Sequence, residues 1–336
     1  MTKWEDDYEG LLQADGRELE EALTTARNIS WRNFGKQISF YAPSFTYYKT
    51  KYFNSSPTAF PTISVTGPSC ALKCKHCRGK VLETMLPAST PEKLIAICTD
   101  LRVKGCIGCL ISGGCLPDGS VPLDRFTDAI AKIKRDLGLT VLVHTGIINS
   151  STAKELKKAG IDAALIDVIG SDETIREVYQ LNARVDDYDE SLKVLSESGI
   201  PTVPHVLVGL HYGTLKGELQ ALRMISKHSP SAVIIIAFMP VHGTPMEKVY
   251  PPVPKEIAKV LISARLMLPK TPIALGCMRP KGEHRNKTDM LAVRAGVNAI
   301  AFPADKAIQL ADSMGLKISF SSLCCSQVFC EIQPLI

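Results

Sequence analysis

Short apolar runs alternate with longer amphipathic stretches from residue 61 onward, and this pattern restricts the fold more than any other feature. The runs are rich in β-branched residues and have the length of buried strands, whereas the stretches between them have helical spacing. Eight strands that alternate with helices predict a parallel α/β barrel, with its reacting groups at the C-terminal strand ends. The eight runs are residues 62–66, 109–112, 140–144, 163–168, 202–210, 232–238, 273–277 and 299–302.

The same pattern divides the chain into three segments. Residues 1–60 precede the alternation and carry leucines and alanines at helical spacing, which predicts an N-terminal helical extension. Residues 61–318 form the predicted barrel, and residues 319–336 form a short tail that contains three cysteines.

Composition and charge exclude several classes of protein. The chain has 39 basic and 34 acidic residues and no basic tract, so we expect no nucleic-acid partner. The first ten residues are acidic and polar, which predicts no signal peptide, and the longest apolar run, residues 232–239, is too short to span a membrane. Eleven cysteines in such a chain predict a cytoplasmic protein with metal ligands and core thiols rather than a disulfide framework.

The loop after the first predicted strand contains three cysteines in a CxxxCxxC spacing, Cys70, Cys74 and Cys77. Three thiolates can bind three irons of a [4Fe–4S] cluster and leave the fourth iron open for a cofactor or substrate. Lysines and arginines in residues 73–80 favour thiolates and offset the charge of an anionic cluster. A zinc knuckle or a set of buried thiols is the alternative, although zinc motifs usually use CxxC pairs.

This loop resembles the signature of the radical S-adenosylmethionine (SAM) enzymes. The resemblance implies a radical SAM (β/α)8 barrel of the TIM type, in which SAM chelates the open iron. It also implies that one electron from the cluster breaks a sulfonium bond and releases a 5′-deoxyadenosyl radical. His76 departs from the family, which usually has another aromatic residue before the last cysteine.

The resemblance also implies which strand ends hold SAM. Ser112, Gly113 and Gly114 resemble the family's Gly-Gly-Glu element for the SAM amino group, with Cys115 in place of the acid. His144 and Asp167 end the third and fourth strands and are the candidates for the ribose and carboxylate. Each could equally be an ordinary strand-end cap, and the paired glycines could be a tight turn without a ligand. The segment around Val208 and Gly209 resembles the ledge on which adenine packs.

Within the family, the chain is similar to biotin synthase over roughly residues 61–318. It shares a Gly-Thr-Pro at residues 243–245, an arginine, Arg279, after strand seven, and an Ala-Gly-Val-Asn turn at residues 295–298. The likeness makes Cys70, Cys74, Cys77 and Arg279 the expected catalytic residues. Biotin synthase builds a second cluster from cysteines on inner strands, and the third and fifth strands here have none, so biotin synthesis is disfavoured.

Other cysteines could supply an auxiliary iron–sulfur cluster instead. Cys277 lies after strand seven, the tail carries Cys324, Cys325 and Cys330, and Cys115 is a further candidate. Three cysteines within seven residues favour a cluster, although buried thiols remain an alternative. A preceding Ser-Ser-Leu is weakly similar to the Ser-Ser-Tyr tail of lipoyl synthase.

The combined pattern most resembles a subunit of the archaeal two-protein lipoyl synthase. That resemblance implies sulfur insertion at C6 or C8 of an octanoyl chain on a lipoyl carrier domain, with the auxiliary cluster as sulfur donor. The implied partners are the octanoylated carrier domain, a second radical SAM subunit and an electron donor such as ferredoxin. Two alternatives stay open: a related radical SAM enzyme that acts on a free small molecule, and a non-catalytic metal-binding scaffold.

Overall fold

The computed structural model describes residues 7–44 and 47–335. The first six residues, on which part of the signal-peptide prediction depends, lie outside this range. The strands are β1 (Gln37–Tyr41), β2 (Thr62–Ser64), β3 (Leu86–Pro87), β4 (Gly108–Ser112), β5 (Thr140–His144), β6 (Ala163–Asp167), β7 (Thr202–Val208), β8 (Val233–Ala237), β9 (Ile273–Leu275), β10 (Ala299–Ala301) and β11 (Lys317–Ser321).

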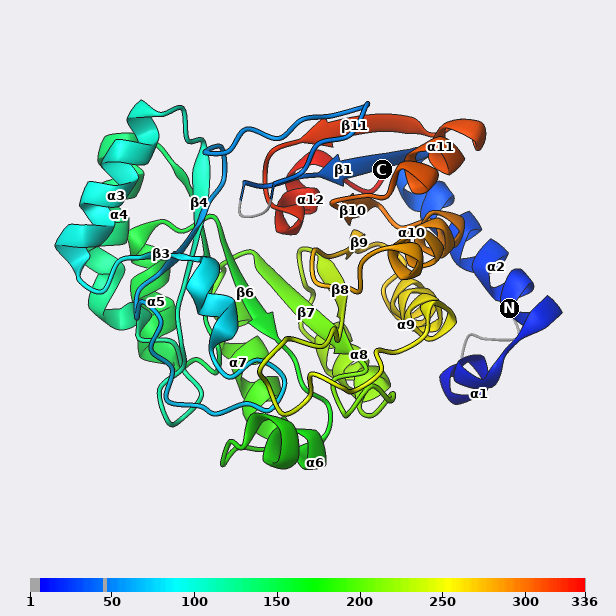
Figure 1. Cartoon of the computed structure of the whole chain (residues 1–336), viewed down its shortest axis with the longest axis horizontal. Coiled ribbons are helices and arrows are strands. Elements are labelled where there is room, and N and C mark those ends of the chain that lie inside the picture. Colours follow the sequence, from blue (N-terminus) through cyan, green and yellow to red (C-terminus); the bar gives the residue numbers. More distant parts are fainter. Residues whose placement is uncertain (1–6, 45–46, 336) are drawn as a thin grey trace.

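Helices cover the outside of this sheet (Figure 1). The α-helices are α1 (Tyr8–Gln13), α2 (Gly16–Phe34), α3 (Pro91–Val103), α4 (Thr127–Leu137), α5 (Ser150–Ala159), α6 (Asp172–Thr174), α7 (Val185–Ser198), α8 (Glu218–Ser226), α9 (Pro254–Met267), α10 (Glu283–Ala295), α11 (Asp305–Ser313) and α12 (Val328–Glu331). Single turns of other helical types are η1 (Lys80–Thr84), η2 (Leu123–Phe126), η3 (Ile175–Tyr179) and η4 (Cys325–Gln327).

All strands belong to one parallel sheet with the order β11-β1-β10-β9-β8-β7-β6-β5-β4-β2-β3. The predicted α/β barrel class is confirmed, in the form of a curled, partial barrel with β11 and β3 as its edge strands (Figure 1). The eight predicted runs became β2 and β4 to β10. Their central strands are buried along their whole length because helices cover one face and the barrel interior the other.

Strands β1 and β11 were not predicted, and they extend the sheet beyond β10. Both contain the tripeptide Ile-Ser-Phe, and the two copies pair in register, with Ser39 opposite Ser319 and Phe40 opposite Phe320. The serine hydroxyl oxygens are 2.8 Å apart and the phenyl ring centroids 5.6 Å apart. This short repeat was a sequence signal that pattern reading along a single segment missed.

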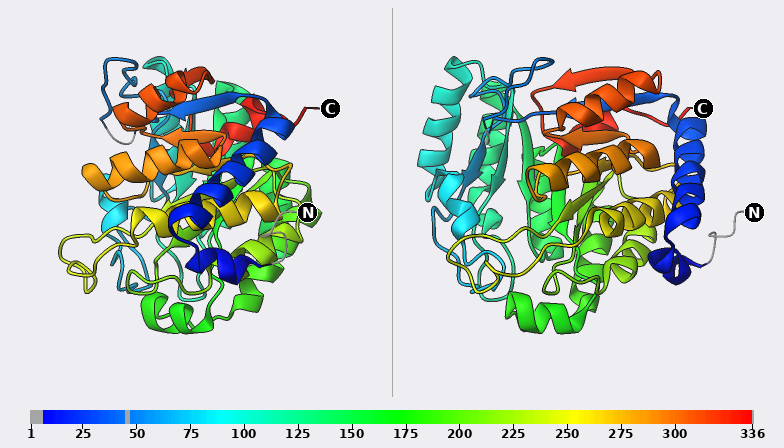
Figure 2. Two further views of the ribbon diagram at one scale, coloured as in Figure 1. Left: turned by 90° about the vertical axis from the view of Figure 1, so that its right-hand side faces the viewer. Right: turned by 45° about the vertical axis from the view of Figure 1, so that its right-hand side comes forward.

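The predicted N-terminal helices are present as α1 and α2, and α2 packs along the outside of α9 and α10 (Figure 2). Their contact forms a second, smaller core that joins Leu11, Leu19 and Leu23 to Ile262 and Ala295. Each Leu in this interface is almost fully buried, which is worth about 2 kcal/mol per side chain. The N-terminal segment is therefore attached to the barrel by an apolar seam. Among the described residues, no helix is both long enough and apolar enough to cross a bilayer.

The tail turns into the barrel instead of lying along its outside. After β11 the chain enters η4, which contacts β8 and β10, and Cys324, Cys325, Ser326 and Gln327 are all buried. The tail thus brings its first two cysteines to the inner face of the sheet, on the same side as the strand ends that were predicted to hold the cofactor.

Candidate active site

The three-cysteine loop leaves the C-terminal end of β2 and is held as a series of tight turns. The amides of Cys77 and Arg78 both donate to the carbonyl of Cys74, at 3.3 and 2.9 Å. The amide of Lys75 donates to the carbonyl of Val178 at 2.7 Å, which ties the loop to the segment after β6. Cys74 is buried, while Cys70 and Cys77 are half-buried. The loop therefore holds its thiols at the end of the barrel where the sequence placed them.

Two of the three predicted cluster cysteines, Cys74 and Cys77, lie together with His76, whereas Cys70 is not part of that group of ligand atoms. The sulfur atoms of Cys74 and Cys77 and a ring nitrogen of His76 all lie within 4.8 Å of one another. A hydrogen bond from the Cys74 thiol, opposed by burial and aided by His76, lowers the pKa of Cys77 to about 4. The Nδ1 atom of His76 is buried and, within the described residues, has no hydrogen-bond partner. A thiolate beside an unpaired imidazole nitrogen suits a bound iron–sulfur cluster and its ligand.

Gly114 determines where Cys70 lies. A Cβ atom at Gly114 would stand 2.1 Å from the carbonyl oxygen of Ser69 and 2.6 Å from Cα and Cβ of Cys70. At Gly113 the nearest atoms are side-chain atoms of Thr66 and Val65, at 3.1 to 3.2 Å. A glycine is therefore required at position 114 because the backbone of the cysteine loop lies against it. This packing is a second reason for the glycine, besides the predicted contact with the cofactor.

Cys115 lies beside Cys70, away from the tail cysteines with which it was grouped as a possible auxiliary ligand. The amide of Ala71 donates to the carbonyl of Cys115 at 2.9 Å. A hydrogen bond from the Cys115 thiol lowers the pKa of Cys70 to about 6, in spite of burial. Its neighbour Ser112 donates from its hydroxyl to the carbonyl of His144 at 3.2 Å, so this serine joins β4 to β5.

His144 and Asp167 meet on the inner wall, where Nε2 of His144 lies 3.4 Å from Oδ1 of Asp167. Burial alone would raise the pKa of Asp167, but the adjacent histidine outweighs it and lowers that pKa to about 2. Burial opposes protonation of His144, yet the charge of Asp167 raises the pKa of its imidazole. The two side chains are half-buried, with accessibilities of 24% and 32%.

The sequence reading missed His205 as a member of this group. His205 lies on β7 in register with Asp167, and its ring centroid is 5.5 Å from that of His144. Tyr179 is half-buried on the side of the cysteine loop, and its ring lies 5.2 Å from the His76 ring. One sequence signal could have identified His205. It lies within the predicted strand that follows the one ending in Asp167, and neighbouring parallel strands place such residues side by side.

The predicted adenine ledge lies at the end of β7, where Val208 is fully buried. Gly209 has a φ of +73°, and its amide donates at 2.8 Å to the carboxyl group of Glu218 on α8. Burial raises the pKa of Glu218 to about 7. Sequence reading did not identify Glu218, whose carboxyl group fixes the direction of the chain as it leaves β7.

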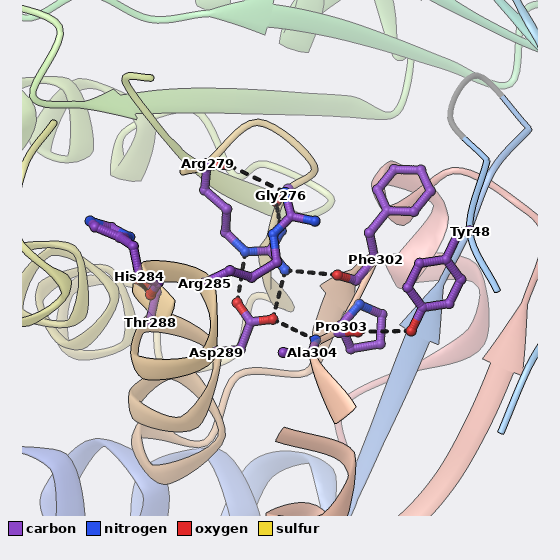
Figure 3. Close-up of polar contacts among 10 residues, drawn as sticks. All are labelled: Tyr48, Gly276, Arg279, His284, Arg285, Thr288, Asp289, Phe302, Pro303 and Ala304. Atoms are coloured by element: carbon purple, nitrogen blue, oxygen red, sulfur yellow. Dashed lines mark hydrogen bonds and ion pairs between the residues drawn. The ribbon is translucent and has the colours of Figure 1, made fainter. Parts of the chain in front are cut away.

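Arg279 is fully buried and belongs to a hydrogen-bonded network between β9, α10 and β10 (Figure 3). Its Nε and Nη2 atoms contact the two carboxylate oxygens of Asp289 at 2.7 and 2.9 Å. Its remaining bonds go to the carbonyls of Gly276 at 2.6 Å and Phe302 at 3.2 Å. These four hydrogen bonds hold the guanidinium group between the ends of β9 and β10 and helix α10. A catalytic role for Arg279 stays a prediction.

The predicted auxiliary ligands divide into two locations. Cys277, Cys324 and Cys325 influence one another's charge inside the barrel, and Cys324 also acts on His144 at the end of β5. A hydrogen bond from Cys325 lowers the pKa of Cys324 to about 7. Cys330 is exposed on α12, and the charges that act on it come from Glu331 and from Asp162, which precedes β6 at the opposite end of the barrel. Within the described residues, however, Cys277, Cys324 and Cys325 do not form a group of three ligand atoms within 4.8 Å of one another, so the auxiliary cluster stays a prediction.

Comparison with known proteins finds similarity to one superfamily of enzymes. Residues 64–225 match the sequence model of the Radical SAM superfamily. The 3-methylornithine synthase of Methanosarcina acetivorans is 21% identical over 310 residues, which cover 91% of this chain and 81% of that protein. The biotin synthase of Buchnera aphidicola is 27% identical over 267 residues, or 75% of this chain and 74% of that one.

Two solved structures share the fold. The crystal structure of methylornithine synthase (PylB) superimposes with a TM-score of 0.65 at 18% identity and covers 95% of both chains. The FeFe-hydrogenase maturase HydG of Carboxydothermus hydrogenoformans has a TM-score of 0.65 at 17% identity and covers 95% of this chain and 76% of its own. The chain is therefore similar to the Radical SAM superfamily over residues 64–225, and it shares the fold of methylornithine synthase and HydG.

Proposed function

We propose that this enzyme generates a 5′-deoxyadenosyl radical from SAM and uses it on a free small molecule that carries polar groups. A [4Fe–4S] cluster on Cys70, Cys74 and Cys77 would supply the electron that cleaves SAM. The chain's own residues would orient SAM through the Ser112–Gly114 backbone and the ledge at Val208 and Gly209. The apolar sheet and the tail would exclude water, which protects a radical from quenching.

The polarity of the inner wall is the observation that carries the choice of substrate. The imidazole of His144 and the carboxylate of Asp167 are accessible within the barrel, at 24% and 32%. Apart from its amide carbonyl, an octanoyl chain offers only methylene and methyl groups, which cannot form hydrogen bonds with the carboxylate or the imidazole. A substrate with its own polar groups satisfies this wall better. The names of the relatives, 3-methylornithine synthase and biotin synthase, also refer to small molecules.

Reductive SAM cleavage is the first test. The protein is reconstituted anaerobically with iron and sulfide, reduced with dithionite and assayed for 5′-deoxyadenosine. We expect formation of 5′-deoxyadenosine that is abolished by Cys70→Ala, Cys74→Ala or Cys77→Ala. Cys106→Ala, which removes a buried thiol from the opposite end of β4, serves as the matched control and should retain it. A colourless protein that contains zinc and produces no 5′-deoxyadenosine would favour the scaffold alternative.

Sulfur insertion as a lipoyl synthase subunit is the second candidate. Electrostatic coupling among the Cys277, Cys324 and Cys325 thiols supports it, since neighbouring thiols could supply ligands to a sulfur-donating cluster. The named relatives favour the small-molecule alternative over this reading.

One experiment separates the two candidates. The reconstituted enzyme is incubated with SAM and either octanoylated lipoyl carrier domain or a panel of amino acids and other small carboxylic acids. Stimulation of 5′-deoxyadenosine formation by a small acid supports the first proposal. A carrier domain whose mass increases through gain of sulfur, in a reaction lost in a Cys324→Ser, Cys325→Ser variant, contradicts it and supports the second.

A further inference from the structure

His144, Asp167 and His205 come from three consecutive strands and share one face of the sheet. In the parallel register His144 pairs with Leu165, and Asp167 pairs with His205. Leu165 and Asp167 are two residues apart on β6 and therefore point to the same side. The side chains that follow this register thus converge on the inner wall. One ligand atom from each of the three residues lies within 4.8 Å of the other two.

His205 is oriented so that one ring nitrogen remains available. Its Nδ1 lies 3.0 Å from the carbonyl oxygen of Val203. A carbonyl can only accept a hydrogen bond, so Nδ1 carries the proton and Nε2 keeps its electron pair. Metal-binding histidines commonly fix their tautomer in this manner, through a bond from the other ring nitrogen to a carbonyl or carboxylate.

The carboxylate of Asp167 can accept a further ligand. Its side chain is 32% accessible, and of the residues that the structure describes, only His144 pairs with it, at 3.4 Å. An ionised carboxylate has about four lone-pair positions. Asp167 therefore keeps lone pairs that are available to a cation.

We propose that His144, Asp167 and His205 bind one divalent transition-metal ion such as Zn²⁺ on the inner wall of the barrel. Two imidazole nitrogens and one carboxylate oxygen are a ligand set that first-row divalent metals favour. Three protein ligands leave a coordination position open, and it would face the interior, where an oxygen atom of a substrate could take it. The proposal reassigns His144 and Asp167 from the SAM contacts predicted above. It does not depend on the proposed function, but with the ion bound a substrate's polar groups would meet this wall through the ion and not through the two side chains themselves.

Zinc binding can be measured without the iron–sulfur cluster. The full-length chain with Cys70→Ser, Cys74→Ser and Cys77→Ser is equilibrated with Zn²⁺ and dialysed, and zinc per chain is measured by mass spectrometry. We expect one zinc ion per chain, lost in each near-isosteric variant, Asp167→Asn and His205→Gln. His211→Gln is the matched control because it alters the partly exposed Glu173–Glu177–His211 group, and it should retain that ion.

X-ray absorption at the zinc edge of the background protein needs no further substitution, so a variant that misfolds does not weaken the test. We expect nitrogen and oxygen neighbours at about 2.0–2.1 Å. The proposal is overturned if no zinc binds, if the Asp167 and His205 variants bind it undiminished while folded, or if sulfur neighbours at about 2.3 Å dominate. A further outcome would also overturn it. If the reconstituted enzyme and its Asp167→Asn variant both lack zinc, and the variant binds SAM more weakly, then Asp167 contacts SAM and not a metal ion.

Discussion

Substitution of Gly114 by alanine should displace the three-cysteine loop, because the added methyl group meets backbone atoms. Its Cβ would lie 2.1 Å from the Ser69 carbonyl oxygen and 2.6 Å from the Cys70 Cα. Neither atom belongs to a side chain that could rotate away. Bringing the closer contact to the ordinary distance of 3.4 Å requires movement of about 1 Å by β4 or by the loop.

A movement of that size has a large expected effect on catalysis and a smaller one on folding. A misplacement of 1 Å in a reacting group can reduce a rate on the order of 100-fold. We therefore expect Gly114→Ala to reduce 5′-deoxyadenosine formation by about that factor. The free energy of unfolding should fall by about 1–3 kcal/mol, the usual consequence of overpacking.

Gly113→Ala is the matched control, since it adds the same methyl group one residue earlier. There the nearest atoms are side-chain atoms of Thr66 and Val65 at 3.1 to 3.2 Å, which can move by a few tenths of an ångström. Both variants are reconstituted in parallel, and iron, sulfide and 5′-deoxyadenosine are measured. Full activity in Gly114→Ala, or an equal loss in both variants, would show that contact with the loop is not the reason for the second glycine.

Three further predictions concern the supports of the site. Replacing Asp289 by Asn removes the charge that pairs with buried Arg279. The free energy of unfolding, measured with urea, should fall by about 3–5 kcal/mol. A fall below about 1 kcal/mol, as for a pair on the surface, would contradict this account of the buried pair. Burial raises the pKa of Glu218 to about 7, so the folded state holds the proton more tightly, and stability should fall as the pH rises from about 4.5 to 7. Glu218→Gln should reduce this dependence of the free energy of unfolding on pH, as measured by urea unfolding at several pH values. An unchanged dependence would show that Glu218 is not the group responsible. Gly209→Ala places a methyl group 2.7 Å from the Pro252 ring at a residue whose φ is +73°, so the backbone at the predicted adenine ledge should shift. We expect calorimetry to show weaker SAM binding by this variant. An unaltered affinity for SAM would exclude this ledge from the SAM site.

The sequence alone was sufficient for the features that are encoded over short distances. The cysteine spacing places three thiols within eight consecutive residues, and a loop that short brings Cys74 and Cys77 close together. The apolar, β-branched runs specified β2 and β4 to β10, and the alternation with helices specified a parallel sheet curled toward a barrel.

Features that join distant segments depended on the tertiary structure. The positions of β1 and β11, the bond of Glu218 to Gly209 and the pairing of Arg279 with Asp289 are examples. The tail shows the same limit, since Cys324 and Cys330 are six residues apart, yet Cys324 is buried and Cys330 is exposed. His205 met His144 and Asp167 only because the register of three parallel strands aligned them. The register and burial of a strand follow from the packing of the whole sheet. The sequence of one strand therefore does not specify which residues of its neighbours it will face.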